Sequence, residues 1–104
     1  MGTFIELLVK VPEETRLESF DYISRLGLTE TLTSATATAT VWIGTDASPS
    51  SVISGSASIS GTVVTQGITG GIDGCIYLIT VTAYTSLSQT LIIQSLLAVQ
   101  ADQI

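Results

Sequence analysis

A glycine-rich turn that opens directly into a long β-branched run constrains the fold of this chain more than any other stretch. Residues 70–74 contain three glycines and an aspartate, which supply the positive-φ positions that a tight reversal needs. After the turn, one face of the run carries Tyr77, Ile79, Val81 and Ala83. Because side chains repeat with a period of two in a strand, the pattern predicts a central strand over 75–84 of an antiparallel sandwich.

The composition favours a single domain over residues 1–104 that contacts other proteins. The chain has nine acidic residues, three basic residues and no histidine, which gives a formal charge of −6. Phosphate backbones and anionic membrane surfaces repel such a chain, so we expect neither a nucleic acid nor a membrane as partner. Only 12% of the residues are charged, against a usual share of roughly 25%, and so weakly charged a surface favours a permanent assembly partner.

The segment 4–11 is predicted to form the first strand, because apolar and charged residues alternate along it. One face would carry Ile5, Leu7, Val9 and Val11. The other face would carry Glu6 and Lys10, so we expect Lys10 to be a solvated charge on an edge strand. Since Lys10 is the only lysine, a Ser–Lys catalytic pair has no other candidate.

The segment that follows allows two interpretations. We predict a strand over 16–25, with a helix over 13–24 as the alternative. Glutamate, arginine and leucine favour the helix, whereas the period of two across residues 20–26 favours the strand. Glu13 and Glu14 follow a proline in a predicted turn, where both carboxylates would be solvated rather than arranged for acid–base chemistry.

Residues 31–43 show the clearest alternation in the chain. One face carries the alanines at 35, 37 and 39 and then Val41 and Ile43, and the other carries the threonines at 36, 38 and 40 with Trp42. The run has no charge and no proline, which makes it prone to pair with another strand if its edge is exposed. We therefore expect either a central strand or a strand that another subunit covers.

Shorter strands and turns fill the rest of the chain. Segments 52–54, 57–60 and 62–68 are separated by glycines, and a reversal at 85–88 leads into a last strand over 89–99. Short strands at this spacing are typical of sandwiches and barrels. The sequence thus predicts an all-β domain of about seven strands, with no helix longer than one or two turns.

The residues do not predict a catalytic or metal-binding arrangement. Without histidine the chain cannot build a Ser-His-Asp or Cys-His site, and Cys75, its only cysteine, is interpreted as a small buried apolar residue. Asp46 and Asp73 each stand alone in a loop, where an aspartate most often bonds nearby backbone. We therefore expect no enzymatic activity, no metal and no cofactor.

The largest aromatic side chains are predicted to anchor the core. Tyr22 and Trp42 are the main candidates, and Tyr77 is expected to bury its ring while its hydroxyl bonds to the backbone. Because aromatic residues make up only 6% of the chain, few rings remain to form an exposed platform for a sugar.

Four stretches together resemble a family of small virion proteins from tailed bacteriophages, the fibre–tail adaptors. These stretches are Asp21–Leu26, Glu30–Ala35, Val41–Ile43 and Gly70–Thr80, within a similarity that covers residues 9–99. The family pattern has an acidic-aromatic-x-x-Arg-Leu segment, a threonine-rich strand, and Gly-Gly-x-x-Gly-x-x-Tyr before a further strand. The resemblance implies a single Ig-like antiparallel β-sandwich without catalytic residues.

The same resemblance implies a structural component of the virion, an adaptor at the neck, tail or baseplate that joins the tail to fibres or neighbouring proteins. Its partners would be other phage structural proteins, in many copies of a symmetric assembly built in the host bacterial cytoplasm. We expect contacts through an N-terminal arm (1–11) and a C-terminal arm (99–104). The candidate interface residues are Phe4, Ile5, Leu7, Val9, Val11, Val99 and Ile104. The alternative hypothesis is a carbohydrate- or host-surface-binding module that decorates the particle.

Overall fold

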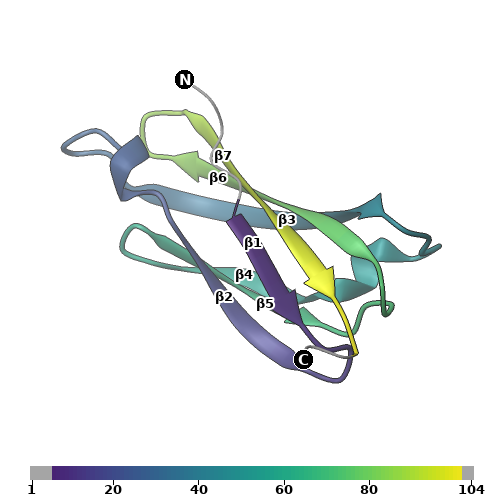
Figure 1. Ribbon diagram of the computed structural model, residues 1–104. Coiled ribbons are helices and arrows are strands. Elements are labelled where there is room, and N and C mark those ends of the chain that lie inside the picture. Colours follow the sequence, from purple (N-terminus) through teal and green to yellow (C-terminus); the bar gives the residue numbers. More distant parts are fainter. Residues whose placement is uncertain (1–5, 102–104) are drawn as a thin grey trace.

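The computed structural model describes the backbone of residues 6–101 and the side chains of residues 8–101, which form a sandwich of two β-sheets (Figure 1). Its strands are β1 (Glu6–Lys10), β2 (Thr15–Asp21), β3 (Leu32–Ile43), β4 (Ile53–Ser60), β5 (Val63–Thr69), β6 (Ile76–Thr85) and β7 (Thr90–Val99). Two short 3₁₀ turns, η1 (Ile23–Arg25) and η2 (Pro49–Val52), complete the described elements. The prediction of an all-β sandwich of about seven strands is confirmed. Within the described range, no helix has the length and apolar character needed to cross a bilayer.

The strand order is β1-β7-β6-β3 in the larger sheet and β2-β5-β4 in the smaller one. Every neighbouring pair is antiparallel except β1 and β7, which run parallel. With the strands lettered A to G in chain order, the sheets are A-G-F-C and B-E-D. An immunoglobulin constant-type sandwich has sheets ABED and CFG, so the order agrees with that arrangement apart from the first strand.

The strand that follows the glycine turn lies in the middle of the larger sheet, between β7 and β3, as predicted. Its inward face carries Tyr77, Ile79, Val81 and Ala83, and all four side chains are completely buried. The glycines at 70, 71 and 74 have φ values of 61°, 95° and 89°, so the turn uses the positive-φ positions expected of it. This buried row of β6 forms the centre of the core that both sheets share.

The second strand is shorter than predicted, and the alternative helix over 13–24 is not observed. β2 ends at Asp21, whose carboxylate accepts hydrogen bonds from the Ile23 backbone N–H (3.0 Å) and from the Thr62 hydroxyl (2.7 Å). This side chain supports the turn into η1, because an aspartate that bonds the N–H two residues ahead favours a reversal. Tyr22 then enters the core, as predicted, and its hydroxyl donates to the Val81 carbonyl (2.7 Å).

β3 has the predicted alternation but lies at the edge of its sheet, so of the two predicted alternatives the central strand is not observed. Ala39 is buried while the threonines at 36, 38 and 40 are exposed. Trp42 lies on the threonine face and is 56% exposed, so its predicted place in the core is also wrong. The physical reason is that the outward face of the larger sheet, on which Trp42 lies, is not covered by any other element of the described chain.

Two glycines lie inside strands, and one of them, Gly55, was predicted to separate two strands. Gly67 is part of β5, where a Cβ atom would lie 2.6 Å from the Ser54 carbonyl oxygen, so the residue permits a close approach of β4. Gly55 lies in β4 with φ of 73°, and the pairing with β5 shifts register between Ser54 and Ser58. The segments 52–54 and 57–60 therefore belong largely to one irregular strand.

β1 is in the opposite phase to the one predicted. Leu8 packs against the core, Val9 is 40% exposed, and Lys10 is only 1% exposed, so the prediction of a solvated Lys10 is wrong. The Lys10 Nζ atom donates to the carbonyl oxygens of Gly70 (2.5 Å) and Val11 (2.7 Å). These acceptors replace water around the ammonium, and burial lowers the pKa of Lys10 below its usual value.

Candidate functional site

The sandwich is elongated, with extents of 44 × 28 × 26 Å, and its loops gather at two opposite ends. We call one of them the η1 end, which consists of residues 22–31, 61–62 and 86–89 (left side of Figure 1). Three large apolar side chains, Ile23, Leu28 and Leu87, are mostly or fully exposed there. An elongated domain with exposed apolar residues on its loops is suited to contacts with other proteins.

A carboxylate holds the two apolar loops of the η1 end together. Glu30 accepts hydrogen bonds from the Gly27 backbone N–H (2.9 Å) and from the Thr85 hydroxyl. These two bonds hold the pKa of Glu30 below its usual value, with the Gly27 bond as the larger cause. Thr31 and Ser86 add two further bonds between the loops, at 2.8 and 3.0 Å. Leu28 and Leu87 are therefore presented by a connected pair of loops.

The opposite end, which we call the η2 end, consists of residues 11–14, 42–52 and 70–75 (right side of Figure 1). It also exposes large apolar side chains, those of Trp42, Ile43 and Ile72. Trp42 and Ile43 are the last residues of β3, and Ile72 lies in the glycine turn before β6. The chain thus exposes one apolar group at each end of its long axis.

The buried hydroxyl of Tyr77 connects the loops of the η2 end. It donates to the Asp46 carboxylate (2.8 Å) and accepts the Ile72 backbone N–H (2.8 Å), and burial raises the pKa of Tyr77 to about 12. The predicted backbone contact of this hydroxyl is confirmed. Asp46 also accepts the Ser48 backbone N–H (2.8 Å), which is the turn role expected of it. Asp73 instead accepts the backbone N–H of Ala101 (2.8 Å).

The outer edge of β1 is identified by the directions of its backbone groups. The Lys10 carbonyl accepts the Gln100 N–H (2.9 Å), so it points toward the chain that continues β7. Because carbonyl directions alternate along a strand, the backbone groups of Val9 and Val11 point away from β7. They form the edge that another strand would have to pair with.

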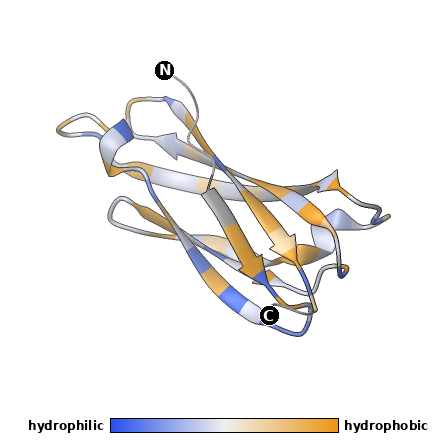
Figure 2. Ribbon diagram, in the orientation of Figure 1, coloured by the Kyte–Doolittle hydropathy of each residue, from blue (hydrophilic) through white to orange (hydrophobic). Residues whose placement is uncertain are grey.

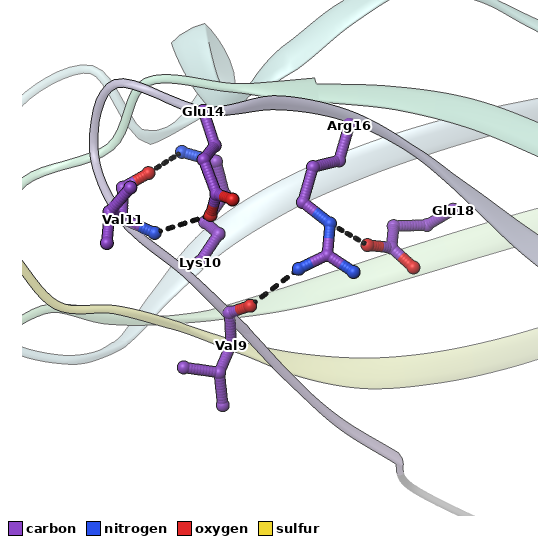
Figure 3. Close-up of polar contacts among 6 residues, drawn as sticks. All are labelled: Val9, Lys10, Val11, Glu14, Arg16 and Glu18. Carbon is purple, nitrogen blue, oxygen red and sulfur yellow. Dashed lines mark hydrogen bonds and ion pairs between the residues drawn. The ribbon is translucent and has the colours of Figure 1, made fainter. Parts of the chain in front are cut away.

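Side chains of this chain already occupy that edge (Figure 3). Arg16 donates to the Val9 carbonyl (2.8 Å), and the Val11 N–H donates to the Glu14 carboxylate (2.9 Å). Arg16 also forms an ion pair with Glu18 (3.3 Å), which keeps its guanidinium beside β1. Charged side chains at a strand edge discourage the addition of a further strand, so β1 is a closed edge.

The other residues considered for chemistry are also placed by the structure. Cys75 is buried, as predicted, with its Sγ atom 3.5 Å from the Thr45 carbonyl oxygen. Glu13 and Glu14 are exposed in their turn, also as predicted. In the range that the structure describes, no three histidine, cysteine, aspartate or glutamate residues gather as a metal site would require.

Of the predicted interface residues, the structure describes the side chains of Val9, Val11 and Val99. Val9 is exposed and Val11 is half-buried, whereas the side chain of Val99 is completely buried in the core. Leu7 contributes its backbone to β1, and Phe4, Ile5 and Ile104 lie outside the described residues. Sequence reasoning missed the apolar groups at the two ends, because loop residues show no periodicity that would distinguish an exposed leucine from a buried one.

These surfaces and the fold define a class of protein: a small all-β sandwich that exposes apolar groups at both ends of its long axis. Comparison with known families is more specific. The family model described as podophage GP4 fiber-tail adaptor protein gp77 matches residues 10–96. The chain belongs to this family of phage fibre–tail adaptors, which confirms the resemblance seen in the sequence. No curated protein matches the chain.

Proposed function

We propose that this chain is a structural component of a podophage virion that joins the tail to a fibre or to a neighbouring tail protein. The family match over residues 10–96 carries the proposal, because it covers most of the chain, including the apolar residues of both ends. Placement at the neck, tail or baseplate, in several copies of a symmetric assembly, is part of the same proposal. So is assembly in the host bacterial cytoplasm.

The two ends of the sandwich suit a bridging role. A bridging protein needs separate surfaces for its two partners. Here the exposed apolar groups lie at the two ends of the long axis of the sandwich, whose extent is 44 Å. In this proposal, Leu28 and Leu87 at the η1 end insert into pockets of one partner, while Trp42 at the η2 end contacts the other. Large side chains that become fully desolvated contribute most of the binding energy of an interface.

The two terminal arms, 1–11 and 99–104, remain proposed contacts in addition to the ends. Among the described residues of the arms, Val9 has the most exposed large apolar side chain. The closed edge of β1 means that such contacts use side chains rather than a further strand paired with Val9 and Val11.

Carbohydrate binding receives less support from the structure. A sugar platform requires exposed aromatic rings that lie together, and two described rings, those of Trp42 and Tyr84, are substantially exposed. Trp42 lies near the end of β3, whereas Tyr84 pairs with Ser34 near its beginning. The two rings are therefore at opposite ends of the strand, and the adaptor role is the better supported proposal.

Mass spectrometry of purified virions tests the role directly. We expect the protein in mature particles, and its absence from them would refute the proposal. To test the ends, a phage lacking the gene is complemented with Leu28→Asp plus Leu87→Asp, or with Trp42→Ser plus Ile72→Ser. Each pair should reduce the particle content of a different partner.

Leu17→Asp is the matched control for these variants. Leu17 is 76% exposed but lies on β2, between the two ends. We expect this variant to leave the composition of the particle unchanged. If it removed the same partners as the paired variants, the loss would reflect general damage to the surface, and the assignment of the ends would be wrong.

A further inference from the structure

A groove opens between the two sheets along β3 and β4. It has a volume of about 220 Å³, and its lining includes Ala35 and Ala37 of β3, Ile53 and Ala57 of β4, and the polar side chains of Thr36, Ser56 and Gln66. Most of these residues are small. The register shift and positive φ at Gly55 make β4 irregular beside the groove, so the sandwich is incompletely filled at this point.

The edge of β3 beside the groove differs from the other sheet edges. β1 is closed by Arg16 and Glu14, β2 carries charged residues that appear as blue bands in Figure 2, and β4 is bent at Gly55. β3 is 12 residues long, has no charge, and pairs with β6 in regular register from Ser34 to Val41. A long, regular and uncharged edge of this kind is a template for another strand.

We propose that the β3 edge and its groove receive an extended segment of a partner virion protein, which adds to the larger sheet as a fifth strand. The segment is uncharged and carries a bulky apolar side chain at every second position. These side chains lie on the same face as Ala35 and Ala37, because side chains at matching positions of paired strands share a face. That face opens into the groove.

The volume of the groove determines the size of the inserted side chain. A cavity of about 150 Å³ holds a benzene molecule, so a groove of about 220 Å³ accommodates one aromatic or about two branched aliphatic side chains. Burial of each such side chain stabilises the complex, and the entropy of ordering the segment opposes it.

A second copy of β3 fits the groove less well. Its residues on the corresponding face would be alanines, which would leave the groove of each copy largely empty. Larger side chains would bury more apolar surface in the groove than alanines can, so the geometry favours a partner with larger side chains. The identity of this partner as a tail or fibre protein rests on the proposed function, whereas the chemistry of the segment follows from the edge and the groove alone.

A synthetic peptide tests the strand addition. The probe is fluorescein-labelled Thr-Val-Thr-Leu-Thr-Val-Thr with a solubilising Lys-Lys tail, and its binding to the full chain is followed by fluorescence polarisation. We expect saturable binding, and at least tenfold weaker binding of a peptide with the same residues in non-alternating order. No binding of the alternating peptide at millimolar protein would overturn the proposal.

Backbone methylation distinguishes a paired strand from simple apolar adsorption. N–H directions alternate along a strand, so one set of alternate residues faces β3 and the other faces solvent. Two probes are methylated on nitrogen, one at the apolar residues and the other at the threonines. One methylated probe should bind at least tenfold more weakly than the unmethylated peptide, while the other should bind with unchanged affinity. Equal affinities of the two methylated probes would rule out backbone pairing with β3.

A variant that fills the groove provides the matched test on the protein. Ala57→Leu places a larger side chain in the groove, whereas the control Ser58→Leu adds the same group to the exposed neighbouring position of β4. We expect Ala57→Leu to weaken peptide binding at least tenfold and Ser58→Leu to leave it within twofold. Circular dichroism confirms that both variants are folded. Equal binding by both would exclude the groove as the site.

Two further outcomes remain informative. If the free chain forms a dimer in sedimentation that Thr38→Lys abolishes, the edge belongs to a second copy and the proposal is overturned. Failure of the peptide experiments with the protein still present in virions would refute only the strand addition. Peptide binding with the protein absent from virions would refute the adaptor role and leave the strand-acceptor site intact.

Discussion

Replacement of Lys10 by methionine tests whether a buried ammonium stabilises the junction of β1 with the glycine turn. The Nζ atom donates to Gly70 (2.5 Å), Val11 (2.7 Å) and, more weakly, Pro12 (3.4 Å). Lys10 and Gly70 are 60 residues apart in sequence, so the contact fastens the first strand to the loop before β6. Methionine preserves most of the apolar stem but cannot donate a hydrogen bond.

The expected effect is the difference between two opposing contributions. Each short hydrogen bond from a charged donor contributes about 1.5–3 kcal/mol, whereas withdrawal of an ammonium from water costs several kcal/mol. Lys10→Met removes both contributions and leaves the half-buried Gly70 carbonyl without its partner, at a cost of about 1–3 kcal/mol. We expect a net loss of about 1–3 kcal/mol in the free energy of unfolding.

Urea unfolding at 25 °C and pH 7 measures this loss. For a domain of this size, 1 kcal/mol corresponds to a shift of about 4–8 °C in Tm. Arg25→Met is the control, because Arg25 makes one long contact to the Ile92 carbonyl (3.3 Å) at the surface, and it should change stability by less than about 0.5 kcal/mol. A Lys10→Met protein as stable as the wild type would show that desolvation outweighs the hydrogen bonds.

The remaining predictions concern the backbone, two titrations and one buried hydroxyl. Gly74→Val should lower stability by about 1–3 kcal/mol, because φ is 89° there while an added Cβ meets no neighbour; unchanged melting would contradict this. The pKa values of Tyr22 and Tyr77 are raised to about 12, so each should contribute up to about 2–3 kcal/mol to the free energy of unfolding, and this contribution is lost as pH rises from 10 to 12. In urea unfolding at alkaline pH, the variant with both tyrosines replaced by phenylalanine should show a smaller fall in stability over this range than the wild type. The lowered pKa of Glu30 should make stability fall on acidification below pH 4.5, and Glu30→Gln should reduce this dependence in acid unfolding curves. Ser95→Ala should raise Tm, because the buried Ser95 Oγ finds no partner in the described part of the chain; a lower Tm would indicate a missed hydrogen bond.

The sequence predicted the strands well where the burial of each face follows from local alternation. β6 is the best example, because its inward row of Tyr77, Ile79, Val81 and Ala83 has the period of a strand and sits in the middle of a sheet. β3 was also predicted with almost correct bounds. Its position at the edge was not predictable, because alternation is the same for a central strand and an edge strand that has one buried face.

The misses arise from contacts between distant parts of the chain. The sequence predicted a solvated Lys10, because a lysine that alternates with apolar residues usually points into solvent. Its burial follows from the hydrogen bond to Gly70, which is distant in sequence. Glu30 drew no attention for the same reason, since its partner Thr85 is 55 residues away. The apolar side chains of the η1 end, and Ile72 of the η2 end, lie outside the strands, where the strand period does not predict burial. A single sequence therefore predicted the core better than the surfaces that are candidates for function.

The two edge strands of the larger sheet differ in whether a further strand can pair with them: β1 is closed by charged side chains, and β3 is open and uncharged. The distribution of charge along the chain affects both edges. Six of the nine acidic residues and all three basic residues precede residue 31, so the segment that contains β1 and β2 carries most of the charge while β3 has none. Two copies that approach each other carry a formal charge of −6 each, and this repulsion opposes pairing between identical chains. An uncharged partner segment meets no such repulsion at β3. An open, uncharged edge on an acidic chain thus favours pairing with a different partner over self-association.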